Sequence, residues 1–243
     1  MTEVRNALQA IEDLTFKDSL PSGLNLLLGA SGCGKTIFCE QFTYETLETG
    51  GKVLWVTTEE LPSRLRESMK RFGWNVEKYE KDGKFTILDA VSPARLGTSE
   101  KDGLGMINLD PTGMLIVLSE QLRAAPNGEA QDKIRPKIIL IIDSISRLLL
   151  SCDYRTVIDF VSCLNSRMEH FGVVGLATLS EGAHDEKALN AVSFSCSGTI
   201  RFRIRDSGET RKRDLRLETL RGRNHDDRWK NYSITSNGLD LEL

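Results

Sequence analysis

Aliphatic runs alternate along the first three quarters of the chain with segments whose apolar residues recur at helical spacing. A nearly unbroken aliphatic run is typical of a strand covered on both faces of a parallel sheet, and the helical spacing is typical of a helix packed on that sheet. The predicted strands are 23–28, 53–57, 85–89, 137–142 and 173–178. The predicted helices are 37–49, 61–72, 76–80, 115–125 and 154–171. This alternation predicts an α/β fold with a mostly parallel, twisted sheet flanked by helices.

The C-terminal quarter has a different pattern. Residues 198–205 and 213–220 alternate apolar and charged side chains on either side of Ser207-Gly208-Glu209, which predicts an antiparallel hairpin. Residues 232–235 and 239–243 flank Asn237-Gly238 and predict a second hairpin. Because the chain has no internal repeat and no linker-like boundary, residues 1–243 are expected to form a single domain.

The segment 29–36, Gly-Ala-Ser-Gly-Cys-Gly-Lys-Thr, fits the phosphate-loop pattern G-x-x-x-x-G-K-[ST] at every fixed position. It lies between a predicted strand and a predicted helix, where backbone N–H groups and the helix dipole attract phosphate groups. The flanks disfavour the alternative of a glycine turn with a solvated lysine. The expected phosphate-binding residues are Ser31, Gly32, Cys33, Gly34, Lys35, Thr36 and Ile37.

Carboxylates follow two of the predicted strands. Glu59 and Glu60 follow 53–57, and Asp143 follows 137–142. Ligands of open α/β sheets bind beyond the C-terminal ends of the strands, so these acids are expected near the phosphate loop. Asp143 with Thr36 would hold Mg²⁺, and Glu59 with Glu60 would activate water. Alternatively, the acids favour only the N-termini of the helices that follow.

Composition narrows the choice of protein class. A chain with 40% hydrophobic and 28% charged residues is typical of a globular protein, and a net charge of −3 excludes a general polyanion binder. Residues 201–230 nevertheless hold eleven Lys and Arg against six Asp and Glu. This basic tract would face nucleic acid or a neighbour's phosphates, or it would be a solvated sheet edge; the sequence leaves both readings open.

Two further features concern location and cysteine chemistry. No apolar run has the length of a membrane span and the first residues lack a signal-peptide pattern, so we expect a cytoplasmic protein without a membrane partner. Five cysteines without a C-x-x-C pair predict reduced thiols rather than a zinc site. Cys33 is the exception to consider, because N–H groups of the loop would lower its pKa, although a filler residue is the simpler interpretation.

Taken together, these motifs resemble the KaiC-like branch of the RecA superfamily, in its single-domain, archaeal form. The resemblance rests on 20–23, the phosphate loop, 56–60, 72–74, 85–90, 141–144, 220–222 and 224–226. It implies a RecA-like core, ATP and Mg²⁺ as cofactors, and a homo-oligomer, usually a hexameric ring, with nucleotide between subunits. By resemblance, Glu59 is the general base, Glu60 supports it, and Arg221 reaches a neighbour's γ-phosphate with His225 close by.

The chain departs from that family's pattern in several places. Thr219 stands where the family has lysine, which removes one of two trans cations and predicts slow ATP hydrolysis. Residues 97–136 exceed the usual length, and a single ATPase unit argues against carrying over clock function. The alternatives to an ATPase are a nucleotide-gated, nucleic-acid-binding recombinase paralogue that modulates repair, and a switch that binds a protein partner. Autophosphorylation is disfavoured, because no acceptor residue is identifiable.

Overall fold

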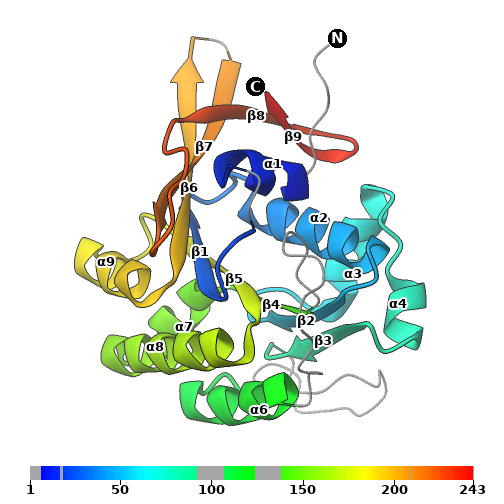
Figure 1. The fold of residues 1–243 in the computed structure, drawn as a ribbon, viewed down its shortest axis with the longest axis vertical. Coiled ribbons are helices and arrows are strands. Elements are labelled where there is room, and N and C mark those ends of the chain that lie inside the picture. Colours follow the sequence, from blue (N-terminus) through cyan, green and yellow to red (C-terminus); the bar gives the residue numbers. More distant parts are fainter. Residues whose placement is uncertain (1–6, 17–18, 92–106, 124–137, 209, 243) are drawn as a thin grey trace.

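Strands and helices alternate to build one sheet with helices on both faces, as shown by the computed structural model in Figure 1. The structure describes residues 7–16, 19–91, 107–123, 138–208 and 210–242. The helices are α1 (Ala7–Leu14), α2 (Lys35–Glu48), α3 (Pro62–Arg71), α4 (Glu77–Lys81), α6 (Pro111–Arg123), α7 (Ile145–Ser151), α8 (Tyr154–Phe171) and α9 (Glu186–Ser195). The strands are β1 (Gly23–Gly29), β2 (Lys52–Thr57), β3 (Phe85–Asp89), β4 (Ile138–Asp143), β5 (Val174–Ser180), β6 (Gly198–Ser207), β7 (Thr210–Leu220), β8 (Lys230–Thr235) and β9 (Gly238–Glu242).

The strand order over the described residues is β3-β2-β4-β5-β1-β6-β7-β8-β9. The first six strands in this order run parallel, and β6 to β9 are joined by antiparallel pairing. The predicted α/β fold, with its mostly parallel sheet and C-terminal antiparallel hairpins, is confirmed. Parallel packing brings the ends of β1, β2, β4 and β5 to one edge, where the phosphate loop lies.

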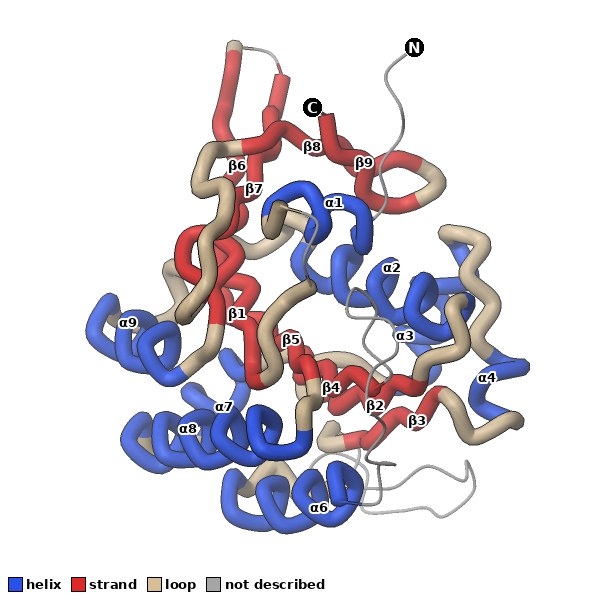
Figure 2. Tube along the Cα trace, viewed as in Figure 1, coloured by secondary structure: helices blue, strands red, loops and turns tan. Residues whose placement is uncertain are grey.

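Two hydrophobic clusters cover the two faces of this sheet. Successive residues of β1 alternate between them: Leu27 packs with α1, α2 and α3, whereas Leu26 and Leu28 pack with α6, α7 and α8. Figure 2 shows the same division, with α2 and α3 on one side of the central strands and α6 and α8 on the other. Burial on both faces explains why the central strands read as continuous aliphatic runs.

Some predicted elements differ from the observed ones. The helix predicted over 115–125 begins earlier, at Pro111, because proline at the first helical position forfeits no hydrogen bond. Helices α7 and α9 were not predicted; α9 has a recognisable signal, since the Asp185 side chain accepts from the Ala188 N–H. Most of the long segment 97–136 lies outside the described residues.

No described helix combines the length and the apolar character that crossing a membrane requires.

Helix α2 carries a buried acid behind the phosphate loop. Glu40 is 1% exposed, and its Oε2 accepts from Ser68 Oγ on α3 at 3.0 Å. Burial raises the pKa of Glu40 to about 8; the Ser68 hydrogen bond opposes the shift, and the carboxylates of Asp143 and Glu60 increase it. The folded state therefore binds a proton that the unfolded chain releases near pH 4.5.

This proton linkage gives the first prediction. Wild-type stability should fall as pH rises from about 5 to about 8, by up to about 1.4 kcal/mol per pH unit from Glu40, because folding opposes its ionisation. Glu40→Gln keeps the acceptor for Ser68 and removes this charge. The unfolding free energies of both proteins are measured by urea titrations followed by circular dichroism. The value for Glu40→Gln minus the value for wild type should increase with pH. Glu120→Gln, at an exposed site on α6, is the control. Parallel pH curves for wild type and Glu40→Gln would contradict the assignment.

Candidate active site

The phosphate loop closes between β1 and α2 through two glycines in left-handed backbone. Gly32 has φ 77° and Gly34 has φ 101°, values that side-chain-bearing residues rarely adopt. A Cβ at Gly34 would lie 2.9 Å from Ile234 Cδ1 on β8, whereas one at Gly32 would meet nothing within 4 Å. A side chain at position 34 would therefore be strained in its backbone and would also require Ile234 to shift.

Lys35 is a buried cation at the first residue of α2. Lys35 is 7% exposed, and its Nζ donates to the carbonyls of Gly29 at 2.7 Å and Ala30 at 2.9 Å. No carboxylate among the described residues forms an ion pair with it. Nζ also donates to Cys33 Sγ at 3.7 Å. A buried lysine side chain at the N-terminus of a helix, without a carboxylate partner in the described residues, fits an anionic ligand such as a polyphosphate.

Thr36 and Asp143 lie together and are the candidate metal ligands of the site. Thr36 Oγ1 donates to Asp143 Oδ2 at 3.0 Å, and Thr178 on β5 donates to Asp143 Oδ1. Burial raises the pKa of Asp143, while the hydrogen bonds from Thr178 and Thr36 oppose the shift. Hydroxyl and carboxylate oxygens are the ligands that Mg²⁺ prefers, so these residues fit that ion.

Glu59 is held beside Asp143 by contacts between the ends of β2 and β4. Ser144 Oγ donates to Glu59 Oε1. Thr58 Oγ1 donates to the Ser144 carbonyl at 2.8 Å and accepts from the Ser144 N–H at 2.7 Å. Thr58 and Ser144 are each 3% exposed, so this pair is a buried clamp that fixes where Glu59 lies.

These groups surround one cleft with a volume of about 230 Å³. It is lined by Ser31, Gly32, Gly34, Lys35, Thr36, Ile37, Glu59, Asp143, Ser144, Thr178 and Ser180. The structure thus brings together most of the residues that the sequence predicted for phosphate, metal and water. Sequence reasoning did not single out Thr178 and Thr58; their polar side chains at strand ends on the ligand edge were the available signal.

Four predicted site residues do not line the cleft: Cys33, Glu60, Arg221 and His225. Cys33 is buried beneath the loop, and burial raises the pKa of its thiol while Lys35 offsets part of the shift, so the filler interpretation describes it better than a reactive thiolate. Glu60 is exposed, and its carbonyl, not its carboxylate, accepts from Thr57.

Arg221 and His225 follow β7 at the surface. The Arg221 guanidinium lies 5.4 Å from the ring centroid of Phe194 on α9 and donates to the Phe194 carbonyl. Phe194 is 81% exposed. His225 is half-buried, with Nδ1 3.4 Å from the Arg223 carbonyl. Neither residue contributes to the cleft of its own chain.

The basic tract 201–230 is largely neutralised by cross-strand pairing. Asp214 is 1% exposed in its side chain and pairs with Arg203 and Arg205. The other pairs are Arg201 with Glu181 and Glu218, Arg216 with Glu218, Arg211 with Asp206, and Asp226 with Arg228 and Lys230. Most of the positive charge counted in the sequence is therefore not a free surface for a polyanion.

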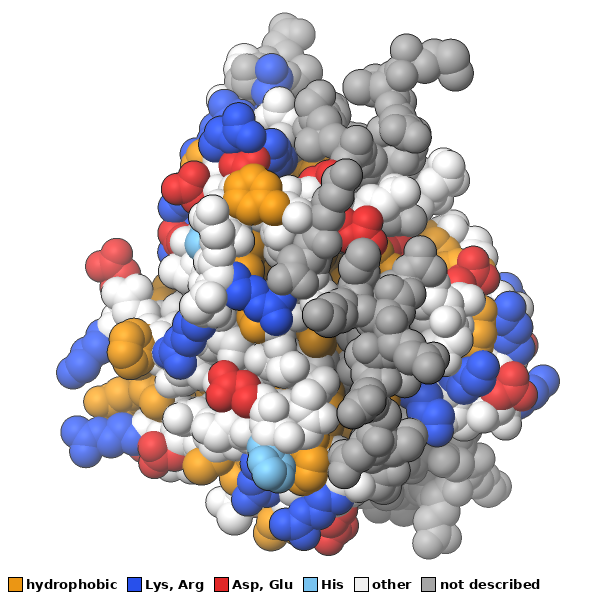
Figure 3. All heavy atoms as spheres, in the orientation of Figure 1, with side chains coloured by type: hydrophobic (Ala, Val, Ile, Leu, Met, Phe, Trp, Pro, Cys, Tyr) orange, Lys and Arg blue, Asp and Glu red, His pale blue; other side chains and the backbone are white. Residues whose placement is uncertain are grey.

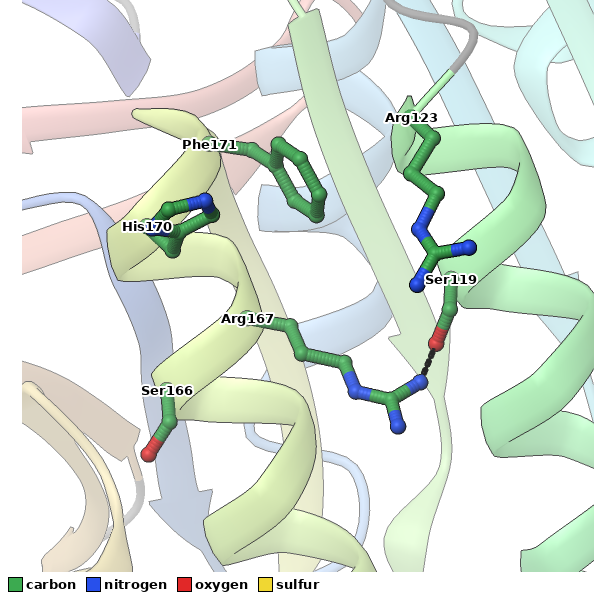
Figure 4. A pocket seen from close by; sticks show the side chains of 6 residues that line it. All are labelled: Ser119, Arg123, Ser166, Arg167, His170 and Phe171. Atoms are coloured by element: carbon green, nitrogen blue, oxygen red, sulfur yellow. Dashed lines mark hydrogen bonds between the residues drawn. The ribbon is translucent and has the colours of Figure 1, made fainter.

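A second cavity, with a volume of about 490 Å³, lies between α6 and α8 (Figure 4). It is lined by Ser119, Arg123, Ser166, Arg167, His170 and Phe171. Arg123 and His170 lie in the last turns of α6 and α8, where a cation complements the helix dipole. The third cation, Arg167, donates to the Ser119 hydroxyl and the Leu115 carbonyl of α6, so contacts within the fold account for all three cations.

Comparisons with known proteins agree with this geometry. A family model described as "ATPase: KaiC" matches residues 7–242. UPF0273 proteins of Thermotoga maritima and Methanocaldococcus jannaschii are each 27% identical to the chain; the alignments cover 97% and 98% of this chain and 94% and 96% of those proteins. The crystal structure of a KaiC-like protein from Pyrococcus horikoshii superposes with a TM-score of 0.77 at 26% identity, over 99% of this chain and 100% of that one.

The loop geometry gives the second prediction. Gly34→Ala and Gly32→Ala should each lower the free energy of unfolding by about 1–3 kcal/mol, because alanine is strained at positive φ. Gly34→Ala should cost more, since its Cβ also meets Ile234. Adding Ile234→Val, which removes the contacting Cδ1, should recover part of the loss in the Gly34→Ala background and none in the Gly32→Ala background. Equal recovery in both backgrounds would show that the close contact is not the cause; chemical denaturation measures all four proteins.

Proposed function

The chain belongs to the KaiC family of ATPases, and we propose that residues 1–243 form one ATPase domain that hydrolyses ATP with Mg²⁺ at a site completed by a neighbouring copy. One observation carries the proposal. Lys35, the Thr36–Asp143 pair and Glu59 line one cleft of the chain, whereas Arg221 is exposed and outside it. In a shared site, a charged side chain that acts in the reaction is absent from the cleft of its own chain and is supplied by a neighbouring chain.

Within one chain, each group has a separable task. The loop N–H groups and Lys35 bind and orient the β- and γ-phosphates of ATP. Thr36 and Asp143 hold Mg²⁺, which, when bound, offsets negative charge on the phosphate oxygens. Glu59, held by Ser144 and Thr58, orients the attacking water and accepts its proton on the carboxylate.

The neighbouring chain supplies Arg221. A guanidinium offsets the charge that develops on the transferred phosphoryl oxygens, so hydrolysis depends on assembly. In the single chain Arg221 lies against the exposed ring of Phe194. In this proposal both side chains belong to the contact between subunits. Thr219, in place of the family's lysine, is exposed on β7 and leaves Arg221 without a second trans cation, which predicts slow turnover.

Several finer points remain predictions: the hexameric form of the ring, the position of His225 near the neighbour's phosphates, and the support of Glu59 by Glu60. The cytoplasmic location and a protein partner are likewise predictions. For the nucleic-acid-binding alternative, the ion pairs of the basic tract reduce the available surface to the outer end of the β6–β7 hairpin.

The third prediction tests the shared site by mixing two inactive proteins. Glu59→Gln should lower kcat about 10²–10⁴-fold and Arg221→Ala about 10³–10⁵-fold. When subunits of the two variants are mixed and allowed to exchange, about a quarter of the interfaces combine an intact Glu59 with an intact Arg221. ATP turnover, measured as phosphate release, should therefore rise far above that of either variant.

The matched control is a mixture of Glu59→Gln with Lys35→Ala. Both of these substitutions damage the side of the interface that carries the cleft, so no combination of subunits restores a complete site. Recovery in the control, or none in the test mixture with exchange verified by size measurements, would overturn the shared-site proposal.

The fourth prediction concerns the Ser144 clamp. Ser144→Ala removes the hydroxyl that donates to Glu59, so kcat should fall about tenfold with KM for ATP little changed, because this hydroxyl positions Glu59 and does not bind phosphate. Ser180→Ala alters the same cleft without touching Glu59 and is the control. A change confined to KM would contradict the assignment.

A further inference from the structure

Strands β7 and β8 part next to a cluster of cations. They pair at Leu215 with Lys230, Asp214 with Asn231 and Arg213 with Tyr232, and no further pair follows in the described residues. Beyond Arg213, β7 continues with β6 towards the tip of their hairpin, whereas β8 turns away with β9. Figure 2 shows the two hairpins diverging at this point.

A small pocket fills the gap between these strands. It has a volume of about 180 Å³ and is lined by Arg211, Lys212 and Arg213 of β7 and by Asn231, Tyr232 and Ser233 of β8. This volume is several times the roughly 30 Å³ share of one water molecule, yet it is below the roughly 300 Å³ at which pockets for drug-sized ligands begin. The pocket therefore suits a single small polar group rather than a whole nucleotide.

The charge in this pocket is unbalanced. Three cations line it without a carboxylate among the described lining residues, and within the described chain no ion pair involves Lys212 or Arg213. Arg211 has an exposed partner, Asp206, at 3.5 Å. Figure 3 shows Lys and Arg side chains gathered over the outer part of the β6–β7 hairpin. Within the described residues, the ion pairs that involve seven of the eleven cations of the basic tract do not extend to Lys212 or Arg213.

One buried donor of a residue that lines the pocket lacks an acceptor among the described residues. The Nε of Arg213 is buried and forms no hydrogen bond, although a buried donor left without a partner is destabilising. The Asn231 amide and the Ser233 hydroxyl add neutral donors to the same space. A guanidinium and neutral donors around a space of this size match the oxygen atoms of a phosphate group.

We propose that the gap between β7 and β8 is a binding site for a phosphate group, separate from the phosphate loop, in which Arg213 is the central ligand. The phosphate belongs to a nucleic-acid backbone or to a small phosphorylated molecule; both present the same oxygens to the site. Binding there is independent of ATP hydrolysis, because it requires neither Glu59 nor Arg221.

The experiment must first remove the other phosphate site. Tyr232 lines this pocket and also donates to the Cys33 carbonyl of the phosphate loop, so the two sites are adjacent. All measurements are therefore made in the Lys35→Ala background, in which the loop lacks its cation. The probes are a fluorescein-labelled oligothymidylate, followed by anisotropy at low salt, and inorganic pyrophosphate, followed by calorimetry.

Arg213→Lys is the decisive variant, because it keeps the charge and removes the planar guanidinium with its fixed set of donors. The affinity for whichever probe binds should fall about tenfold or more, the loss expected when a charge-assisted hydrogen bond is removed. Arg211→Gln with Lys212→Gln should also weaken binding and, for the oligonucleotide, reduce the salt dependence of its affinity by about one unit of slope for each phosphate that is no longer neutralised. Lys70→Gln with Lys81→Gln, at exposed positions on α3 and α4, removes equal charge and is the matched control.

The outcomes distinguish the two possible sources of the phosphate group and define the results that would overturn the proposal. Binding of the oligonucleotide alone identifies a nucleic-acid phosphate, and binding of pyrophosphate identifies a small phosphorylated ligand. The proposal is overturned if neither probe binds the Lys35→Ala protein, if Arg213→Lys binds as well as its parent, or if the control weakens binding equally. Thermal unfolding midpoints of all variants establish that each is folded. None of these results depends on turnover, so they stand whether or not the shared ATPase site is correct.

Discussion

The ammonium group of Lys35 sets the main constraint on this molecule. It is nearly excluded from water, it has no carboxylate partner among the described residues, and two carbonyls at the end of β1 hold it. Carbonyl dipoles lower the cost of burying a cation without cancelling its charge. The loop must therefore bend tightly enough to present Gly29 and Ala30 to Nζ, and the glycines at positions 32 and 34 allow that bend. The result is a buried lysine side chain that lines the cleft of the phosphate loop, where a bound anion would contact it.

The carboxyl groups at the same edge of the sheet are held by hydroxyl donors. Asp143 and Glu59 lie across the cleft from Lys35, and Glu40 is buried behind them. Hydroxyl donors, namely Thr36, Thr178, Ser144 and Ser68, bond to these carboxylates instead of cations. Neutral donors hold a carboxylate in place and leave its charge available for a metal ion or a proton. One edge of the sheet thus places the basic side chain of the phosphate loop and the carboxyl groups of Asp143 and Glu59 around the same cleft, as the proposed binding of phosphate and magnesium requires.

The sequence predicted the part of this arrangement that local patterns encode. Continuous aliphatic runs identified the central strands, because burial on both faces leaves no room for polar residues. The phosphate-loop spacing located Lys35 and Thr36, and strand ends located Glu59 and Asp143. The Thr58–Ser144 clamp and the Thr178 hydrogen bond were not predicted, since they depend on which strands become neighbours: β2 and β5 both flank β4, although they are distant from each other in the chain.

The charges of the C-terminal basic tract are a second case in which the sequence alone does not show which side chains meet in the fold. A count over 201–230 gives an excess of five positive charges, eleven minus six, and suggests a polyanion-binding surface. In the folded hairpin, cross-strand register decides which charges meet: Arg203 lies directly opposite Asp214, and Arg216 lies opposite Arg201 with Glu218 between them as a shared partner. A shift of one residue in that register would move every one of these side chains to the other face. Net charge along a strand therefore says little about binding, and the informative quantity is the charge left where pairing stops. In this hairpin, the ion pairs of the described residues do not extend to Lys212 or Arg213, where β8 leaves β7.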